Sequence, residues 1–190
     1  MIDIALLKEM LKEHPRFQHS LGVANMAIKL NMLHDLKVSN VKIVTAALLH
    51  DITKEMDIEE QIELLKKHKP ELVNDELLLS LPVMHAFSGS VVAKLKYEVE
   101  DEGIINAICY HTTGRNNMSD LEKLIFLSDY TETSRCGQQF EIIRELSYES
   151  IDKAIIKMYE FNFEYIKRKK KHIHSLSENA YKYYKGVTKC

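Results

Sequence analysis

Turn-forming residues are scarce in this sequence of 190 residues, which contains only 6 glycines and 3 prolines. A sandwich or barrel of many short strands needs frequent tight turns, so the composition favours helices. The 3 cysteines (Cys109, Cys136 and Cys190) are widely spaced and include no Cys-x-x-Cys pair. The cysteine pattern therefore supports neither a disulfide framework nor a zinc site made of thiolates.

Long apolar runs are also missing. No stretch approaches the roughly 20 residues needed to span a bilayer, and Asp3, Lys8 and Glu9 interrupt the N-terminal segment where a signal peptide would be apolar. Charge of one sign does not dominate, because 26 Lys and Arg residues face 28 Asp and Glu residues, for a net charge of -2. We therefore expect a cytoplasmic protein that neither enters a membrane nor binds nucleic acid.

The apolar material is ample for a core, since hydrophobic residues make up 45% of the chain. Neither a repeat nor a Ser/Gly-rich linker divides the sequence, so residues 1–190 are expected to form a single domain. Apolar residues recur at helical spacing almost throughout, and no segment has the pattern of a strand. The predicted fold class is all-α, with helices over 2–13, 15–34, 41–52, 57–68, from 82 to at least 95, 102–111, 120–131, from 151 into a basic run at 167–171, and 176–185. Ser39, Asp101 and Ser119 are predicted N-caps, the last with Glu122 in a capping box.

Polar residues that can bind metal occupy positions on these helices where an apolar side chain is expected. They are His19, His50, Asp51, His85, His111 and Asp129. Burying a carboxylate is costly unless it is paired or bound to a metal. One histidine on an apolar face is more often a hydrogen-bonded core residue than a ligand. Six such residues near helix ends, with a contiguous His-Asp pair, indicate a shared metal site.

The chemistry of these side chains suits such a site. Imidazole and carboxylate ligands without thiolate are typical of iron, manganese, zinc or cobalt. A bound cation lowers the pKa of its water to about 7, and two metals about 4 Å apart can hold both oxygens of a phosphoryl displacement. In the expected arrangement Asp51 is the bridge. One metal is bound by His19, His50, Asp51 and Asp129, and the second is completed by His85 and His111.

The order of these six residues resembles that of the HD-domain metal-dependent phosphohydrolases. The flanking segments carry more specific matches: HPRFQHSLGVANMA, AALLHDITK, HAFSGSVVA, AICYHTTGR and LEKLIFLSDYTETSR. They are similar to segments of the YqeK family, bacterial HD-domain enzymes that split diadenosine tetraphosphate symmetrically into two ADP. The resemblance extends over about residues 5–185. It implies an HD-domain helical bundle with a C-terminal helix and tail closing over the cleft.

The resemblance also implies roles for individual residues. The implied metal ligands are His19, His50, Asp51 and Asp129, and the implied cofactor is iron, one or two ions, with manganese or cobalt as substitutes. His85 and His111 would bind either a second metal or the leaving phosphate. Arg16 and Lys54, each one helical turn from a ligand, would contact phosphate, while Thr112 and Arg135 match positions that touch nucleotide. Each of these last four is otherwise a solvated polar residue.

The tail departs from the family pattern at one position. The family usually carries Ile-His-Pro there, whereas Ser175 follows Ile173 and His174 in this chain. In the family the tail folds back over the nucleotide, so Lys171 and His174 are expected to contact substrate. The run from Lys167 to Lys171 is either a solvated helix end, which the helix dipole favours, or a source of positive charge for a tetraphosphate.

The expected function is metal-dependent hydrolysis of diadenosine tetraphosphate to two ADP by a homodimer. Asp51 holds the metal whose hydroxide attacks a central phosphorus, and Arg16 and Lys54 stabilise the charge that develops on phosphate. The expected substrate contacts are Arg16, His19, Lys54, His85, His111, Thr112, Arg135, Lys171 and His174. Two alternatives remain open: an HD phosphohydrolase for a nucleoside phosphate, an alarmone or a cyclic nucleotide, and a catalytically silent module that senses a nucleotide.

Overall fold

Helices make up the regular secondary structure of residues 16–188, the part of the chain that the computed structural model describes. In chain order they are α2 (Phe17–Leu33), α3 (Asn40–Leu49), α4 (Ile58–His68), the 3-10 helix η1 (Pro70–Leu72), α5 (Asp75–Leu79), α6 (Leu81–Lys96), α7 (Glu102–Tyr110), α8 (Asp120–Thr131), α9 (Gln138–Glu149), α10 (Ile151–Arg168) and α11 (Ser175–Val187). The prediction of an all-α fold is confirmed for these residues, and the helix predicted over 2–13 lies outside them. None of the described helices is both long and apolar enough to cross a membrane.

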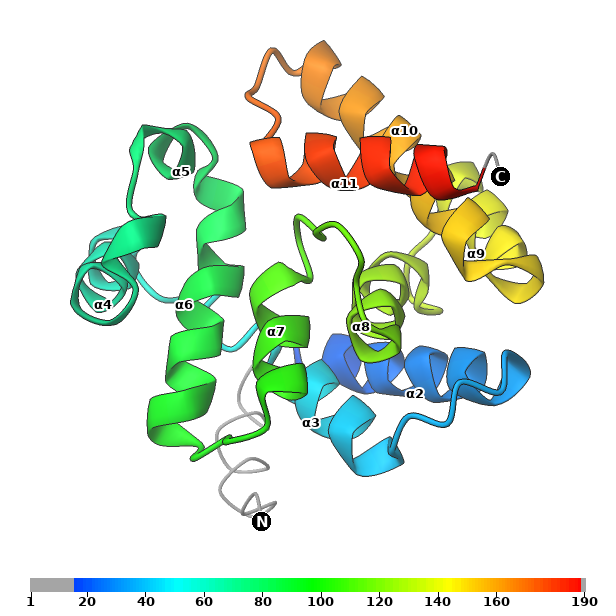
Figure 1. Ribbon diagram of the computed structural model, residues 1–190, viewed down its shortest axis with the longest axis horizontal. Helices are drawn as coiled ribbons and strands as arrows, with labels where there is room; N and C mark the ends of the chain where they lie inside the picture. Colours follow the sequence, from blue (N-terminus) through cyan, green and yellow to red (C-terminus); the bar gives the residue numbers. More distant parts are fainter. Residues whose placement is uncertain (1–15, 189–190) are drawn as a thin grey trace.

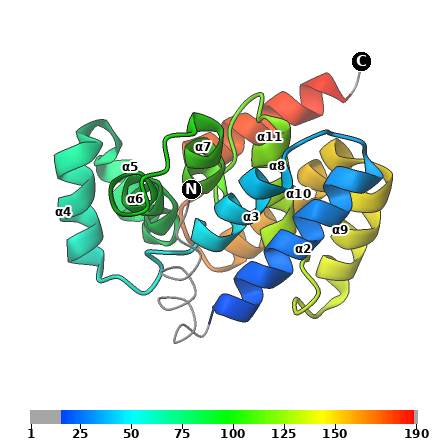
Figure 2. The same cartoon turned by 90° about the horizontal axis from the view of Figure 1, so that it is seen from below.

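The main core lies between α2, α3, α7 and α8, which pack against one another and against α10. α6 runs beside α7 and also packs against α4 and α5 (Figure 1), and a smaller apolar cluster lies among these helices. On the other side of the core, α10 packs against α8, α9 and α11. Figure 2 shows α4 to α6 at one end of the molecule and α9 at the other, with α2, α3 and α8 between them. The helices at the two ends of the molecule therefore pack against the same central group, α6 against α7 and α9 against α8.

The predicted N-caps are largely confirmed. The Ser119 hydroxyl accepts a hydrogen bond from the Glu122 backbone N–H, and the Glu122 carboxylate accepts one from the Ser119 N–H at 2.9 Å, so α8 begins with a capping box. Asp101 accepts a hydrogen bond of 3.1 Å from the Ile104 N–H at the start of α7. Ser39 lies at the predicted N-cap of α3, but its side chain makes no capping hydrogen bond.

The α-helices α5 and α9 and the 3-10 helix η1 were not predicted from the sequence. α5 has only 5 residues, too few for an apolar period to register. α9 buries Ile143 and Ser147 and leaves Ile142 exposed, so its apolar stripe is narrow. α3 ends at Leu49, before its predicted end, because the chain then tightens into turns with i to i+3 hydrogen bonds. These turns contain Asp51.

The loop after α7 depends on glycine at position 114. Gly114 has a φ of +62°, in the left-handed region that glycine adopts without strain. A Cβ atom there would collide with the Tyr159 hydroxyl. That hydroxyl donates a hydrogen bond of 2.8 Å to the Thr113 carbonyl, which ties the loop following His111 to α10. Position 114 therefore requires glycine for two reasons: its left-handed backbone conformation and the close approach of the Tyr159 hydroxyl.

We predict that Gly114→Ala lowers the free energy of unfolding by at least about 2 kcal/mol, because left-handed strain and overpacking each cost about 1–3 kcal/mol. Urea unfolding followed by far-UV circular dichroism measures the loss. Gly186→Ala in α11 is the matched control, since a Cβ there meets nothing within 4 Å. Equal stability of the two variants would contradict the role given to Gly114.

Candidate active site

The six side chains predicted as metal ligands come together at the centre of the fold. His19 is in the first turn of α2, and Asp129 is in the last turn of α8. His85 projects from α6. His50 and Asp51 follow the end of α3, and His111 follows the end of α7. Because these five helices pack against one another, residues from five separate segments of the chain meet at one place.

Asp51 is the hub of the cluster. Its Oδ1 atom lies 3.1 Å from His85 Nε2 and 3.5 Å from His111 Nε2, and its Oδ2 atom lies 3.7 Å from His50 Nε2. The residue is only 2% exposed, and His50 is fully buried. The Thr53 hydroxyl donates a hydrogen bond of 2.8 Å to the His85 carbonyl, which ties the turn carrying Asp51 to α6. Asp51, His50 and His111 form a group with one ligand atom from each within 4.8 Å of the others.

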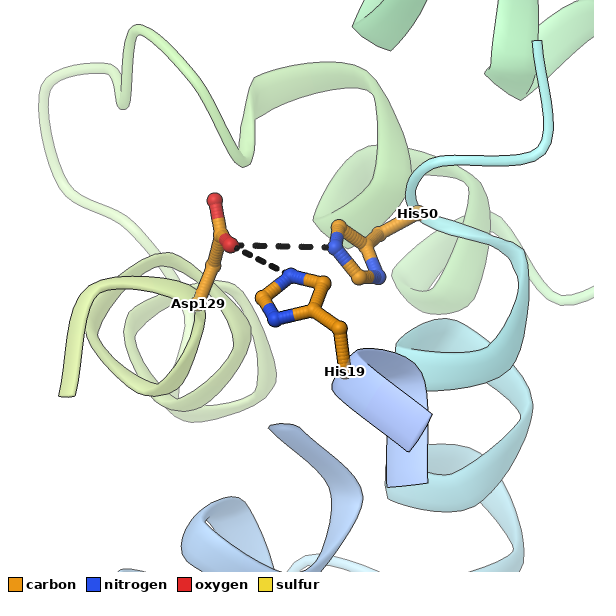
Figure 3. Close-up of side chains that lie close together, drawn as sticks. All are labelled: His19, His50 and Asp129. Atoms are coloured by element: carbon orange, nitrogen blue, oxygen red, sulfur yellow. Dashed lines mark ion pairs between the residues drawn. The ribbon is translucent and has the colours of Figure 1, made fainter. Parts of the chain in front are cut away.

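A second group shares His50 with the first. Asp129 Oδ1 lies 2.9 Å from His19 Nε2 and 3.8 Å from His50 Nε2, as Figure 3 shows. The three ligand atoms lie within 4.8 Å of one another. The side chains of His19 and Asp129 are 14% and 18% exposed, so this group is the open side of the cluster. Two candidate metal groups therefore meet at His50, one buried and one accessible.

Backbone carbonyls fix the state of two of the rings. His50 Nδ1 lies 2.7 Å from the Ala47 carbonyl, and His111 Nδ1 lies 2.7 Å from the Ile108 carbonyl. A carbonyl can only accept, so each Nδ1 carries a proton and each Nε2 is turned toward Asp51, where it can bind metal when it carries no proton. This is the arrangement by which histidine ligands are oriented in metal sites.

The remaining polar atoms favour a cation at the centre. The Nε2 atoms of His19 and His50 are buried and have no hydrogen-bond partner among the described residues. His19 Nδ1 lies 3.2 Å from Glu132 Oε1, and its Nε2 lies 2.9 Å from Asp129 Oδ1. Burial alone would lower the pKa of His19, but the contacts with Asp129 and Glu132 raise it. When the ring is neutral, one of its nitrogen lone pairs faces a carboxylate. A cation satisfies such facing lone pairs, so the residues present fit a metal ion.

The protonation states agree with this donor set. Burial lowers the pKa of His50 to about 4 and also lowers the pKa of His85, so both rings are neutral at pH 7, the form that binds metal. Burial alone would raise the pKa of Asp51, but the three imidazole rings around it hold that pKa below its ordinary range. The pKa of Asp129 is likewise lowered, because the contact with His19 outweighs burial. The site thus offers neutral imidazoles at His50 and His85 and ionised carboxylates at Asp51 and Asp129.

Two of the predicted phosphate contacts reach the hub. Lys54 Nζ lies 2.9 Å from Asp51 Oδ2 and 3.0 Å from Oδ1. Arg16 lies 3.4 Å from Asp51 through its guanidinium and 2.8 Å from Glu55 through Nε. Both cations therefore lie beside the carboxylate of the buried ligand group.

The predicted nucleotide contacts Arg135 and Thr112 lie next to different residues of the cluster. The Arg135 guanidinium pairs with Asp129 Oδ1 at 2.9 Å on the open side. Thr112 follows His111 directly, and its hydroxyl is buried without a hydrogen-bond partner among the described residues. The structure brings both residues to the site, while their contact with nucleotide stays a prediction.

The segment at the start of α11 lies against α5 and α6. His174 is the N-cap of α11, where its Nδ1 accepts a hydrogen bond from the Leu176 N–H, and its ring packs 6.0 Å from that of Phe87 in α6. The Glu76 carboxylate of α5 accepts hydrogen bonds from the N–H and hydroxyl of Ser175, at 2.6 and 2.8 Å. These contacts hold the tail against α5 and α6. Lys171 is exposed just before them, and substrate contact by Lys171 and His174 stays a prediction.

Sequence reasoning missed Glu132, which is only 1% exposed. Besides facing His19 Nδ1, its carboxylate accepts hydrogen bonds from the Ser134 N–H at 2.7 Å and from the Ser134 hydroxyl. Gly22, one turn after His19 on α2, makes room for it, because a Cβ there would lie 2.6 Å from Glu132 Oε2. Two features of the sequence could have indicated Glu132. It follows Asp129 by three residues, and Gly22 follows His19 by three residues on the helix that faces it.

Comparison with known proteins identifies the family. The HD domain model matches residues 16–134, the part of the chain that contains all six candidate ligands. The symmetrical bis(5'-nucleosyl)-tetraphosphatase of Staphylococcus aureus is 38% identical over 152 residues, which cover 79% of this chain and 76% of that one. The enzyme of the same name from Bacillus subtilis is 32% identical, over 87% of each chain.

A solved structure has the same fold. The crystal structure of an HD superfamily hydrolase from Clostridium acetobutylicum, described as involved in NAD metabolism, matches 98% of this chain and 99% of its own. The TM-score is 0.93 at 29% sequence identity. With this fold, the matched HD domain and relatives above 30% identity over most of both chains, the protein belongs to the HD-domain family, among the symmetrical bis(5'-nucleosyl)-tetraphosphatases.

Proposed function

We propose that this protein hydrolyses diadenosine tetraphosphate at its central phosphoanhydride and releases two ADP. The observation that carries the proposal is the buried His/Asp cluster around Asp51, in a chain whose relatives are named for this reaction. The cluster lies in the matched HD domain, and basic side chains stand beside it. A module that only sensed a nucleotide would have no need of two buried carboxylates.

We propose iron as the metal, with manganese or cobalt as substitutes. His19, His50, Asp51 and Asp129 would hold one ion, and His111 with His85 would either complete a second site or contact phosphate. A metal bound there lowers the pKa of water and so supplies a nucleophile near neutral pH. The fit rests on the buried His50 Nε2, which has no hydrogen-bond partner among the described residues, and on His19 Nε2 facing the Asp129 carboxylate.

The chain's own residues bind and orient the polyphosphate. Arg16 and Lys54 lie beside Asp51, so a phosphate group next to that carboxylate meets both cations and gains stabilisation as charge builds on its oxygens. Arg135 provides a third cation next to Asp129. ADP is a weakly basic leaving group and departs without protonation by a strong side-chain acid. We further propose that the protein acts in the cytoplasm as a homodimer and binds no nucleic acid, in line with its net charge of -2.

The first prediction concerns the products. Purified protein incubated anaerobically with diadenosine tetraphosphate and iron should release ADP alone, resolved by ion-exchange chromatography, and a chelator should abolish the release. ATP with AMP would contradict symmetrical cleavage. No turnover with iron, manganese or cobalt would favour another nucleotide substrate, or a silent sensor if every nucleotide tested is left intact.

The second prediction concerns the hub. Asp51→Ala should lose bound metal and activity together, because it removes the carboxylate at the hub of the cluster, while helix content stays nearly unchanged. Metal analysis by mass spectrometry and circular dichroism measure the two effects. Asp120→Ala, at an exposed aspartate in α8, is the control and should keep both metal and activity. Full metal occupancy in an inactive Asp51→Ala protein would count against Asp51 as a ligand.

The third prediction concerns Glu132 as a positioning residue. Glu132→Gln should weaken metal binding about 10–100-fold, the usual effect of changing the partner that orients a histidine ligand. Competition with a fluorescent chelator measures the affinity. Saturating metal should recover most of the activity, and the thermal midpoint should stay near that of the wild type. A large drop in thermal midpoint with unchanged metal affinity would make the role of Glu132 purely structural.

A further inference from the structure

Two cavities adjoin the candidate active site, and they differ in character. One, of about 430 Å³, is lined by charged and polar side chains, among them Arg16, Glu55 and Glu132. The other, of about 560 Å³, lies between α8, α9 and α10, and Asp129 and Arg135 are part of its wall. Arg135 lines both cavities, so the two lie on either side of it. The second cavity therefore begins at the candidate metal centre and extends away from it.

Four aromatic side chains line the cavity between α8, α9 and α10, and we call it the aromatic pocket. They are Tyr130, Phe140, Phe161 and Tyr165. The rings of Tyr130 and Phe140 lie 4.8 Å apart, and the Arg168 guanidinium lies 5.7 Å from the centre of the Tyr165 ring. An aromatic wall with a neighbouring cation is the kind of surface on which nucleobases stack.

Packing of the core accounts for only part of this aromatic wall. Tyr130 and Phe161 pack partly against the main core. Tyr165, in contrast, is 53% exposed although it is a large aromatic residue, and it lies on the face of α10 that lines the pocket. The amides of Gln139 and Asn162 also line the pocket and offer hydrogen-bond donors and acceptors beside the rings. Polar groups among aromatic side chains are typical of small-molecule sites.

The symmetry of the proposed reaction indicates which ligand the aromatic pocket would bind. Cleavage at the central phosphoanhydride leaves a nucleoside diphosphate on each side of the bond, so one nucleoside must extend from the metal centre in each of two directions. The polar cavity, whose lining includes the cations Arg16 and Arg135 and no aromatic residue other than His19, suits phosphate rather than a base. We propose that the aromatic pocket binds one of the two nucleosides of the substrate, with its base stacked on Tyr165 and Phe140. This inference rests on the proposed function, because the substrate class comes from it.

The test compares ligands with two nucleosides and with one. The first ligand is a diadenosine tetraphosphate analogue with a methylene group in place of the central bridging oxygen, which the enzyme does not cleave. The second is adenosine 5'-tetraphosphate. Isothermal titration calorimetry of metal-loaded protein gives both dissociation constants. Their ratio measures what the second nucleoside adds to binding.

Tyr165→Ala and Phe140→Ala, alone and combined, should weaken binding of the two-nucleoside analogue, by about tenfold for each stacking ring removed. In the double variant the ratio of the two dissociation constants should fall toward one, because only one nucleoside site is left, whichever site the one-nucleoside ligand uses. Tyr165→Phe keeps the ring and is the matched control, so it should bind as the wild type does.

A ratio that stays at its wild-type value in the double variant would overturn the proposal, and this includes equal weakening of both ligands. The outcome is separate from the test of the proposed function, because the calorimetry needs no turnover. A wild-type protein that binds the analogue but releases no ADP from the natural substrate would contradict the proposed function alone. Circular dichroism of the variants checks that the folded state is retained.

Discussion

The burial of one charged carboxylate governs the arrangement of this molecule. Asp51 is 2% exposed and ionised, and a buried charge is tolerated only when its surroundings compensate for lost water. Three imidazoles and Lys54 surround it, and they come from the ends of α3 and α7, from α6 and from the turn after α3. Any shift of these helices would leave the charge unpaired. The packing of these helices and the charge of Asp51 therefore depend on each other.

The position of the ligands at helix ends has a local cause. The last carbonyls of a helix lack partners within it. At the ends of α3 and α7, a histidine ring accommodates one of them, since His50 Nδ1 donates to the carbonyl of Ala47 and His111 Nδ1 donates to that of Ile108, each three residues earlier. The same bond completes the helix end and aims the opposite nitrogen at Asp51. Two separate helices use this device, which makes the direction of the lone pairs a consequence of backbone geometry.

Apolar periodicity was enough to predict most of the helices, and the six candidate ligands were singled out because they interrupt that periodicity. His19 and His85 are polar residues on faces that are otherwise apolar. Glu132 gave no such interruption, since it follows α8 at a helix end where polar residues are ordinary. The aromatic pocket was missed for a different reason. Spacing tells which face of a helix is apolar but not which helices meet, and α9, with its narrow stripe, was not predicted at all.

The balance of charge around the site links metal binding to substrate binding. Carboxylates of Asp51, Asp129, Glu55 and Glu132 stand close to three basic side chains, and each of these basic side chains is paired with at least one of the carboxylates. The histidine rings His50 and His85 add no charge at pH 7, because burial lowers the pKa of both. A polyphosphate that approached the bare cluster would face carboxylates whose partners are already engaged. A divalent ion among these side chains would compensate the carboxylates and leave Arg16, Lys54 and Arg135 to attract phosphate, so we expect binding of the polyanion to depend on prior binding of the cation.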